Sequence, residues 1–249
     1  MRLHVLGSSG GYSSPDNPTS GFLLEHGPAR LWLDAGTGTF AALQRLGDFR
    51  KLDAIVLSHI HPDHCVDVYA LFVAIRYGVD GGRLRIPLYA PPGTREALAP
   101  LFLEDGYKTL GEGLDFHVVE AGDTVEIAGV RMSFLRTQHP AHTLAMRAET
   151  DAGTLTYSAD AGPDVDLAPF AKDSDLFLCE ATYQEGKVGA PVHLSARQAA
   201  ETALRAGARK LALTHVWPAF DPEVSEEEAR VAAPDLSIRW AKPGKVFEI

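Results

Sequence analysis

Three histidines and an aspartate stand within six positions of this sequence, as His59, His61, Asp63 and His64. Each of these side chains carries lone pairs or charge that need a partner when they leave water. A metal ion could satisfy all four, whereas a helix cap at Asp63 would not require three imidazoles. With 10 histidines in 249 residues, the spacing H-x-H-x-D-H should arise by chance about once in a thousand such chains. We therefore predict a metal site in this segment.

The elements around this motif indicate how it is presented. The apolar run 54–57 before it predicts a short buried strand, and the stretch 65–77 after it predicts a mostly apolar helix. The motif should therefore lie on a loop from a strand to a helix. Residues two apart on an extended segment point the same way, so His59 and His61 can bind one ion together. The other two motif residues then face a second position.

Composition limits the class of protein and its partners. The chain has 249 residues, of which 45% are hydrophobic, and this predicts a single domain over residues 1–249. Its net charge of -10 argues against an extended surface for nucleic acid or an anionic membrane. No stretch has the pattern of a signal peptide or a membrane span, so we expect a cytoplasmic protein. The oligomeric state stays open, a homodimer included.

The rest of the chain alternates between strand and helix patterns. Two strand-rich stretches, each joined to helices, predict an α/β protein in which two sheets pack face to face with helices outside, a four-layer αββα sandwich. The predicted strands are 3–6, 22–25, 30–33, 54–57, 86–90, 114–119, 124–127, 131–136, 143–148, 154–157, 176–179, 210–213 and 246–249. The predicted helices are 40–46, 65–77, 94–103 and 196–206, with a break at 78–82. The glycine-rich segment 7–11 predicts either a close approach to a ligand or an ordinary turn.

Further ligands must come from elsewhere, because a six-residue motif cannot complete two metal sites. His139, Asp160 and His215 each follow a predicted strand, and we predict that they complete the sites. Asp34, at the end of the strand 30–33, is a candidate for holding ligand histidines from behind. The cysteines Cys65 and Cys179 stand in no C-x-x-C pair and are expected to be buried and free.

His193 is a candidate proton donor that does not bind metal. Ser195 and Gln198 form a capping box at the start of the helix 196–206. That helix spans about 16 Å and the strand after it also spans about 16 Å, so their outer ends lie at the same edge. His193 can thus reach the site that His215 completes. The alternative is a histidine on a solvent-exposed loop.

Together these residues resemble the metallo-β-lactamase superfamily, whose pattern H-x-H-x-D-H, His, Asp, His covers nearly the whole chain. The resemblance implies an αββα sandwich with a two-metal site at one edge. It implies that His59, His61 and His139 hold the first metal, that Asp63, His64 and His215 hold the second, and that Asp160 bridges them. Zn²⁺ is the expected metal at both positions, with Mn²⁺ or Fe²⁺ as alternatives, because imidazole and carboxylate ligands suit all three.

The segment 193–215, the glycine-rich start of the chain and the stretch 180–183 resemble the phosphodiesterase branch typified by ribonuclease Z. In that branch the histidine that matches His193 assists phosphodiester cleavage. Asp63 and His193 are the candidate catalytic residues. Glu180 could orient His193 or serve the fold. Ribonuclease Z carries a long tRNA-gripping arm between the third histidine and the bridging aspartate. Here the two residues lie only 21 positions apart, at 139 and 160, and the arm is missing.

These features favour a metal-dependent phosphodiesterase for small phosphodiesters such as cyclic nucleotides. A metal-bridging hydroxide would attack phosphorus while His193 protonates the departing alkoxide. A lactonase or thioesterase, a tRNA 3′-processing endonuclease and a metal-stabilised binding module without catalysis are the alternatives. His142 could touch the substrate, and Trp217 and Phe220 form either a base-stacking wall or part of the core.

Overall fold

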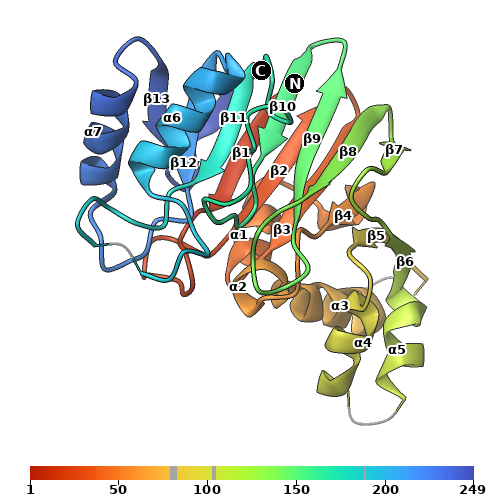
Figure 1. Cartoon of the computed structure of the whole chain (residues 1–249). Coiled ribbons are helices and arrows are strands. Elements are labelled where there is room, and N and C mark those ends of the chain that lie inside the picture. The colour runs from red at the N-terminus through yellow and green to blue at the C-terminus, as the bar shows by residue number, and fades with distance from the viewer. Residues whose placement is uncertain (79–82, 103–104, 188) are drawn as a thin grey trace.

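In the computed structural model, which describes residues 1–78, 83–102, 105–187 and 189–249, two seven-stranded sheets pack face to face (Figure 1). The first sheet runs in the order β14 (Val246–Glu248), β1 (Arg2–Gly7), β2 (Gly21–His26), β3 (Ala29–Ala35), β4 (Ala54–Val56), β5 (Ile86–Ala90) and β6 (Leu114–Val118). The second runs in the order β13 (Ser237–Trp240), β12 (Lys210–Thr214), β11 (Leu176–Glu180), β10 (Gly153–Tyr157), β9 (Leu144–Thr150), β8 (Val130–Arg136) and β7 (Thr124–Ile127).

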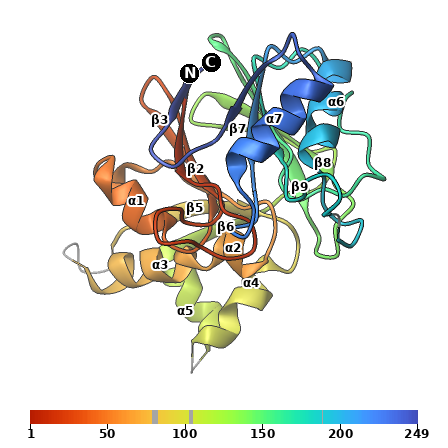
Figure 2. The same cartoon turned by 90° about the vertical axis from the view of Figure 1, so that its left-hand side faces the viewer.

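The helices cover the outer faces of the two sheets. The first sheet carries α1 (Thr39–Arg45), α2 (Pro62–Cys65), α3 (Asp67–Tyr77), α4 (Thr94–Leu98) and α5 (Gly106–Gly113), with short 3-10 turns at Phe49–Lys51 and Ala99–Leu101. The second sheet carries α6 (Ala196–Ala206) and α7 (Pro222–Ala232). Figure 2 shows α6 and α7 on the opposite side of the molecule from α1 and α3. The predicted αββα layering is confirmed.

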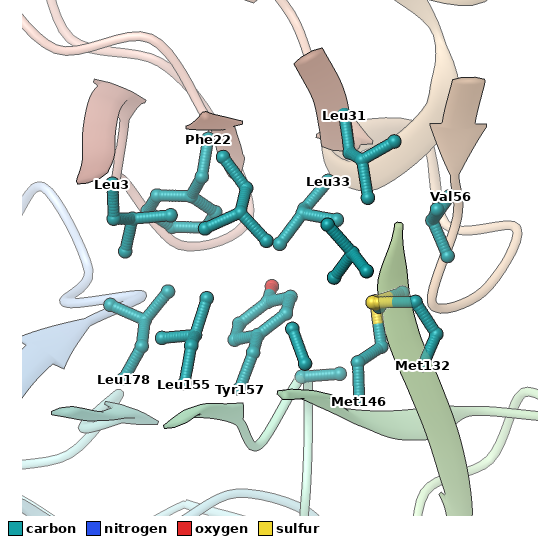
Figure 3. Close-up of a cluster of buried hydrophobic side chains, with 14 of the residues drawn as sticks. Leu3, Phe22, Leu31, Leu33, Val56, Met132, Met146, Leu155, Tyr157 and Leu178 are labelled. Carbon is teal, nitrogen blue, oxygen red and sulfur yellow. The ribbon is translucent and has the colours of Figure 1, made fainter. Parts of the chain in front are cut away.

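Burial on both faces explains why the central strands are apolar throughout. In β2, Leu24 points into the core between the sheets and Leu23 into the core beneath the first helical layer, and neither is exposed. Figure 3 shows Leu3, Phe22 and Leu33 of the first sheet facing the side chains of the second sheet. Each fully buried leucine contributes about 1.5–3 kcal/mol by leaving water. This packing holds the two sheets, and therefore their loops, in register.

Every predicted strand is present, within a few residues at its ends. The predicted helix 65–77 is divided at Val66 into α2 and α3, and the predicted helix from 94 ends as α4 followed by a 3-10 turn. The helices α5 and α7 and the strand β13 were not predicted. Position 103 of the second helix and positions 79–82 of the predicted break lie outside the described residues.

Two smaller predictions also concern the site. The chain between 139 and 160 forms the antiparallel β9–β10 hairpin, as expected for a protein without an inserted arm. Cys65 and Cys179 are buried free thiols, and burial raises the pKa of Cys65 to about 12.

None of the helices in the described part of the chain is both long and apolar enough to cross a membrane.

Candidate metal centre

Histidines and aspartates from both sheets converge where the ends of their strands meet. The motif residues follow β4 of the first sheet, and the others follow β8, β10 and β12 of the second. One group whose donor atoms all lie within 4.8 Å of one another is His59, His61, His139 and Asp160. A second such group is Asp63, His64 and His215. The structure thus brings together all seven residues that the sequence singled out as candidate ligands.

Asp160 lies between the two groups and presents one oxygen to each. Its Oδ2 lies 3.6 Å from Nε2 of His59 and 3.6 Å from Nε2 of His139. Its Oδ1 lies 3.2 Å from Nε2 of His64 and 3.5 Å from Nε2 of His215. A carboxylate that faces two groups of nitrogen donors in this way has the arrangement needed to bridge two cations.

Hydrogen bonds on the far side of the rings set which nitrogen faces the centre. Nδ1 of His64 lies 2.8 Å from Oδ2 of Asp34, and Nδ1 of His139 lies 3.1 Å from the carbonyl oxygen of Val192. Both oxygens are acceptors, so both Nδ1 atoms carry the proton. With Nδ1 engaged on the far side, Nε2 is the atom of each ring that faces the centre and would bind a metal.

Asp34 supports a second ring through a serine. Ser58 Oγ donates to Asp34 Oδ2 at 2.8 Å, so it accepts the proton of His59 Nδ1, which lies 2.9 Å away. The backbone N–H of Ser58 and the hydroxyl of Tyr157 also donate to Asp34, at 2.7 and 2.8 Å. Figure 3 shows the Tyr157 hydroxyl pointing from the second sheet toward the first. Asp34 is fully buried, and it orients both His59 and His64.

Glu180 has the corresponding position in the second sheet. Its Oε1 accepts a hydrogen bond from the backbone N–H of Ala161 at 2.6 Å and lies 3.0 Å from Nδ1 of His193. Its Oε2 accepts from Thr182 Oγ1 at 2.7 Å. Thr182 Oγ1 in turn accepts from Nδ1 of His215 at 2.7 Å. Glu180 therefore orients His193 directly and His215 through a hydroxyl, and it holds the backbone beside Asp160, a set of roles that the sequence left open.

Several donor atoms at the centre are unsatisfied. Nε2 of His59, Nε2 of His64 and Oδ1 of Asp160 are buried and have no hydrogen-bond partner among the described residues. Each such atom costs about 1–3 kcal/mol. Divalent cations would satisfy these atoms, and imidazole nitrogens with carboxylate oxygens form a donor set that suits Zn²⁺, Mn²⁺ or Fe²⁺.

The electrostatics of the cluster also favour cations. Burial opposes ionisation of Asp160, but the neighbouring His215 and His64 hold the pKa of Asp160 well below its usual range. Burial likewise opposes ionisation of Asp63, and His64 and His215 hold the pKa of that carboxyl low. Burial lowers the pKa of His59, so this ring stays neutral. Burial opposes protonation of His64, but the carboxylates around it raise its pKa well above the usual range, so a cation at its Nε2 would displace a proton.

His193 lies against both groups of candidate ligands. Its ring centroid is 5.1 Å from that of His139 and 5.2 Å from that of His215, with which it is stacked. Burial opposes protonation of the ring, but the Glu180 carboxylate prevails and raises the pKa of His193 to about 8. A third group whose donor atoms lie within 4.8 Å of one another is Asp160, His193 and His215. The first two groups already contain all seven candidate ligands without His193, so its ring is available for another role.

The backbone around the centre is constrained. Among the non-glycine residues with positive φ are Asp34 (55°), Ala159 (50°) and His215 (58°), two of them site residues and the third adjacent to Asp160. Such conformations cost free energy and concentrate at functional sites. The glycine-rich segment 7–11 contacts one of the candidate ligands directly. The N–H of Gly11 donates to Oδ2 of Asp63 at 2.9 Å, so the loop supports the candidate ligands.

The remaining candidates, His142, Trp217 and Phe220, belong to none of these groups of ligating residues. His142 is exposed, and no group of metal-ligating atoms found in the described parts of the chain includes it. Trp217 is 41% exposed, whereas Phe220 is partly buried and packs against the core under α6 and α7. Phe220 is therefore part of the core, whereas Trp217 is exposed enough to contact a ligand.

This fold and this His/Asp centre define a protein class, and residues 29–216 match the model of the beta-lactamase superfamily domain. The chain belongs to the metallo-β-lactamase superfamily. Its His/Asp cluster is compatible with the metal site of a metallo-hydrolase.

Particular relatives cover almost the full chain. It is 34% identical over 242 residues to the uncharacterized protein Rv1339 of Mycobacterium tuberculosis, covering 94% of this chain and 88% of the relative. It is 30% identical over 251 residues to the probable metallo-hydrolase YhfI of Bacillus subtilis, covering all of both. The crystal structure of YhfI superposes with a TM-score of 0.88 at 26% identity, covering 100% of this chain and 98% of YhfI. Ribonuclease Z of Mycobacterium bovis is 26% identical over 265 residues, covering 96% and 94%.

The role of Asp34 can be tested by Asp34→Asn. The amide keeps the size of the side chain but loses acceptor capacity toward His64 and Ser58, so we expect metal affinity to fall about 10- to 100-fold. Titration against a chromophoric chelator measures this loss. Asp151→Ala, whose side chain is 89% exposed, is the control and should bind metal as the wild type does. Equal affinity in Asp34→Asn would show that Asp34 serves only the fold.

Proposed function

We propose that this protein is a metal-dependent phosphodiesterase that hydrolyses small phosphodiesters, such as cyclic nucleotides, with two divalent cations. The observation that carries the proposal is the position of His193. Its ring faces both groups of candidate ligands, completes neither, and is held by the buried Glu180. An oriented imidazole beside a two-cation centre is suited to protonate a leaving oxygen.

The chain's own residues divide the chemistry between them. Cations held by the seven proposed ligands would lower the pKa of bound water and neutralise phosphoryl oxygens. Nδ1 of His193 is engaged by Glu180, so Nε2 is the atom that delivers the proton to the leaving oxygen. The Glu180 carboxylate stabilises the protonated ring before transfer. Asp63, the other proposed catalytic residue, accepts a hydrogen bond from the N–H of Gly11 that orients its carboxylate, and it can accept a proton from the attacking water.

The size and charge of the protein favour a small substrate. The ribonuclease Z relative is named as an enzyme that cleaves RNA, whose nucleotides are joined by phosphodiester bonds. Binding a whole tRNA requires many contacts to phosphates. This chain has a net charge of -10, and only the β9–β10 hairpin separates His139 from Asp160. A small diester needs two cations and a few local groups.

A substrate screen tests this proposal. We expect the metal-loaded protein to hydrolyse bis(p-nitrophenyl) phosphate and at least one cyclic nucleotide, without efficient 3′ processing of precursor tRNA. The measurement is kcat/KM on each substrate at near-physiological salt after loading with Zn²⁺, Mn²⁺ or Fe²⁺. Faster turnover of lactones or thioesters than of every diester would favour the carbonyl-directed alternative, since that chemistry has less need of His193. Efficient tRNA cleavage with inactivity on small diesters would overturn the proposal.

A further inference from the structure

We infer that Tyr12 and Trp217 form an aromatic edge that binds the base of a nucleotide substrate beside the metal centre. This inference rests on the proposed phosphodiesterase function and names the part of the substrate that the cations do not hold. The two rings are 52% and 41% exposed. They contact each other edge to face, with ring centroids 6.4 Å apart and planes at 68°.

Backbone contacts tie this edge to the centre from both sides. Trp217 follows the candidate ligand His215 by two positions, and Tyr12 directly follows Gly11, whose N–H donates to Asp63 at 2.9 Å. The N–H of Gly10 donates to the carbonyl of Val216 at 3.1 Å, which joins the two segments. These contacts limit how far the segments that carry the two rings can move from the candidate ligands.

Glycine at positions 10 and 11 allows the indole to lie on the loop. A Cβ at Gly10 would come within 3.0 Å of Cδ1 of Trp217, and a Cβ at Gly11 would come within 3.2 Å of Nε1. Gly11 also has a φ of 71°, which side-chain-bearing residues rarely adopt. The segment 7–11 therefore contributes to the site twice, as a support for Asp63 and as the platform on which Trp217 rests.

The chemistry of the edge selects a base over the other parts of a nucleotide. A phosphodiester held by cations would place its substituents beside the centre, where Tyr12 and Trp217 present exposed aromatic surface. A ribose is small and non-planar, whereas a planar base can stack on one ring over its whole face and meet the other edge-on. Stacking accepts any base, so the edge should favour nucleotides without strong selection among bases.

A matched pair of substrates isolates this contact. Thymidine 5′-(p-nitrophenyl phosphate) and methyl p-nitrophenyl phosphate share the leaving group and differ in the nucleoside. We expect Trp217→Ala and Tyr12→Ala each to lower the ratio of kcat/KM for the first substrate over the second by about tenfold, the scale of one lost stacking contact. Effects on folding or metal loading divide out of this ratio. Trp217→Phe and Tyr12→Phe should restore most of it.

Tyr77→Ala is the control, because that ring is 72% exposed on α3, and it should leave the ratio unchanged. An unchanged ratio in Trp217→Ala and Tyr12→Ala would overturn the inference while the proposed function stands. If the wild type hydrolyses neither diester, the proposed function fails. Calorimetry then decides separately on the edge, which requires the metal-loaded protein to bind adenosine 5′-monophosphate more tightly than ribose 5-phosphate, with the preference reduced in both alanine variants. Equal binding of these two probes by the wild type would exclude a base-binding edge.

Discussion

Replacing Asp160 by alanine is expected to remove metal from the purified protein and to lower its rate on phosphodiesters by more than about 100-fold. Loss of a residue that only hydrogen-bonds to a metal ligand lowers metal affinity about 10- to 100-fold. Asp160 is proposed to bind both cations itself, so its loss should have a larger effect. Its two oxygens face different groups of imidazoles at 3.2–3.6 Å. Alanine leaves both groups without their shared carboxylate, and Asp63 is then the one carboxylate among the proposed ligands of two dications.

Elemental analysis measures this effect, and we expect two divalent ions per wild-type chain. Asp164→Ala is the matched control, because Asp164 is an exposed aspartate four positions further along. That variant should keep both its ions and its rate. A fully active wild-type protein with one ion or none would contradict the two-cation proposal, as would unchanged metal content in Asp160→Ala.

The second large effect is expected from His193→Ala. This variant should keep its metals but lose about 100-fold or more in rate on substrates with poor leaving groups, because general acid catalysis contributes about 10²- to 10⁴-fold. A cyclic nucleotide releases an alkoxide that needs a proton. p-Nitrophenolate departs without one, so bis(p-nitrophenyl) phosphate should lose much less. The measurement is the loss of rate on the cyclic nucleotide divided by the loss of rate on bis(p-nitrophenyl) phosphate.

Two further variants separate the roles around this ring. His142→Ala removes an exposed histidine and should change neither rate. Glu180→Gln keeps the imidazole but weakens the group that raises its pKa, so it should reproduce part of the leaving-group dependence. Equal losses on both substrates in His193→Ala would mean that His193 positions the substrate and does not act as the acid.

Local pattern predicted the strands and α6 well, because their signals are contained within each segment. The capping box of α6 is formed by Ser195 and Gln198 as expected. α5 was missed because it contains three glycines, which are poor helix formers. It is stabilised by tertiary packing, with Leu110 fully buried and Gly113 close against Phe72.

The other missed elements differ in cause. α7 does carry a start signal, since Asp221 caps the helix and Pro222 occupies its first turn, but its run of glutamates is equally typical of a solvated loop. β13 has a single buried residue, Ile238, and it forms as a strand because β12 offers a parallel partner. No pattern within four residues can reveal that partner.

The candidate ligands were recognisable because their types and spacing carry the chemistry. The groups that orient them were only partly recognisable. Asp34 stands at the end of a predicted strand and was a natural candidate, but the hydrogen bond that it accepts from Tyr157 joins residues 123 positions apart. Thr182 and Ser58 are common residues whose hydroxyls matter only because Glu180 and Asp34 lie behind them. Such relationships depend on the packing of two sheets, which local sequence does not encode.

The seam between the sheets links metal supply to folding. The proposed ligands after β4 belong to the first sheet, and His139, Asp160 and His215 belong to the second. Cations bound by both sets would bind the native state and not the unfolded chain, adding about 2.7 kcal/mol of stability when free metal exceeds its Kd a hundredfold. The midpoint of thermal unfolding should then rise with free metal concentration. Metal starvation would reduce the amount of folded protein, not only its activity.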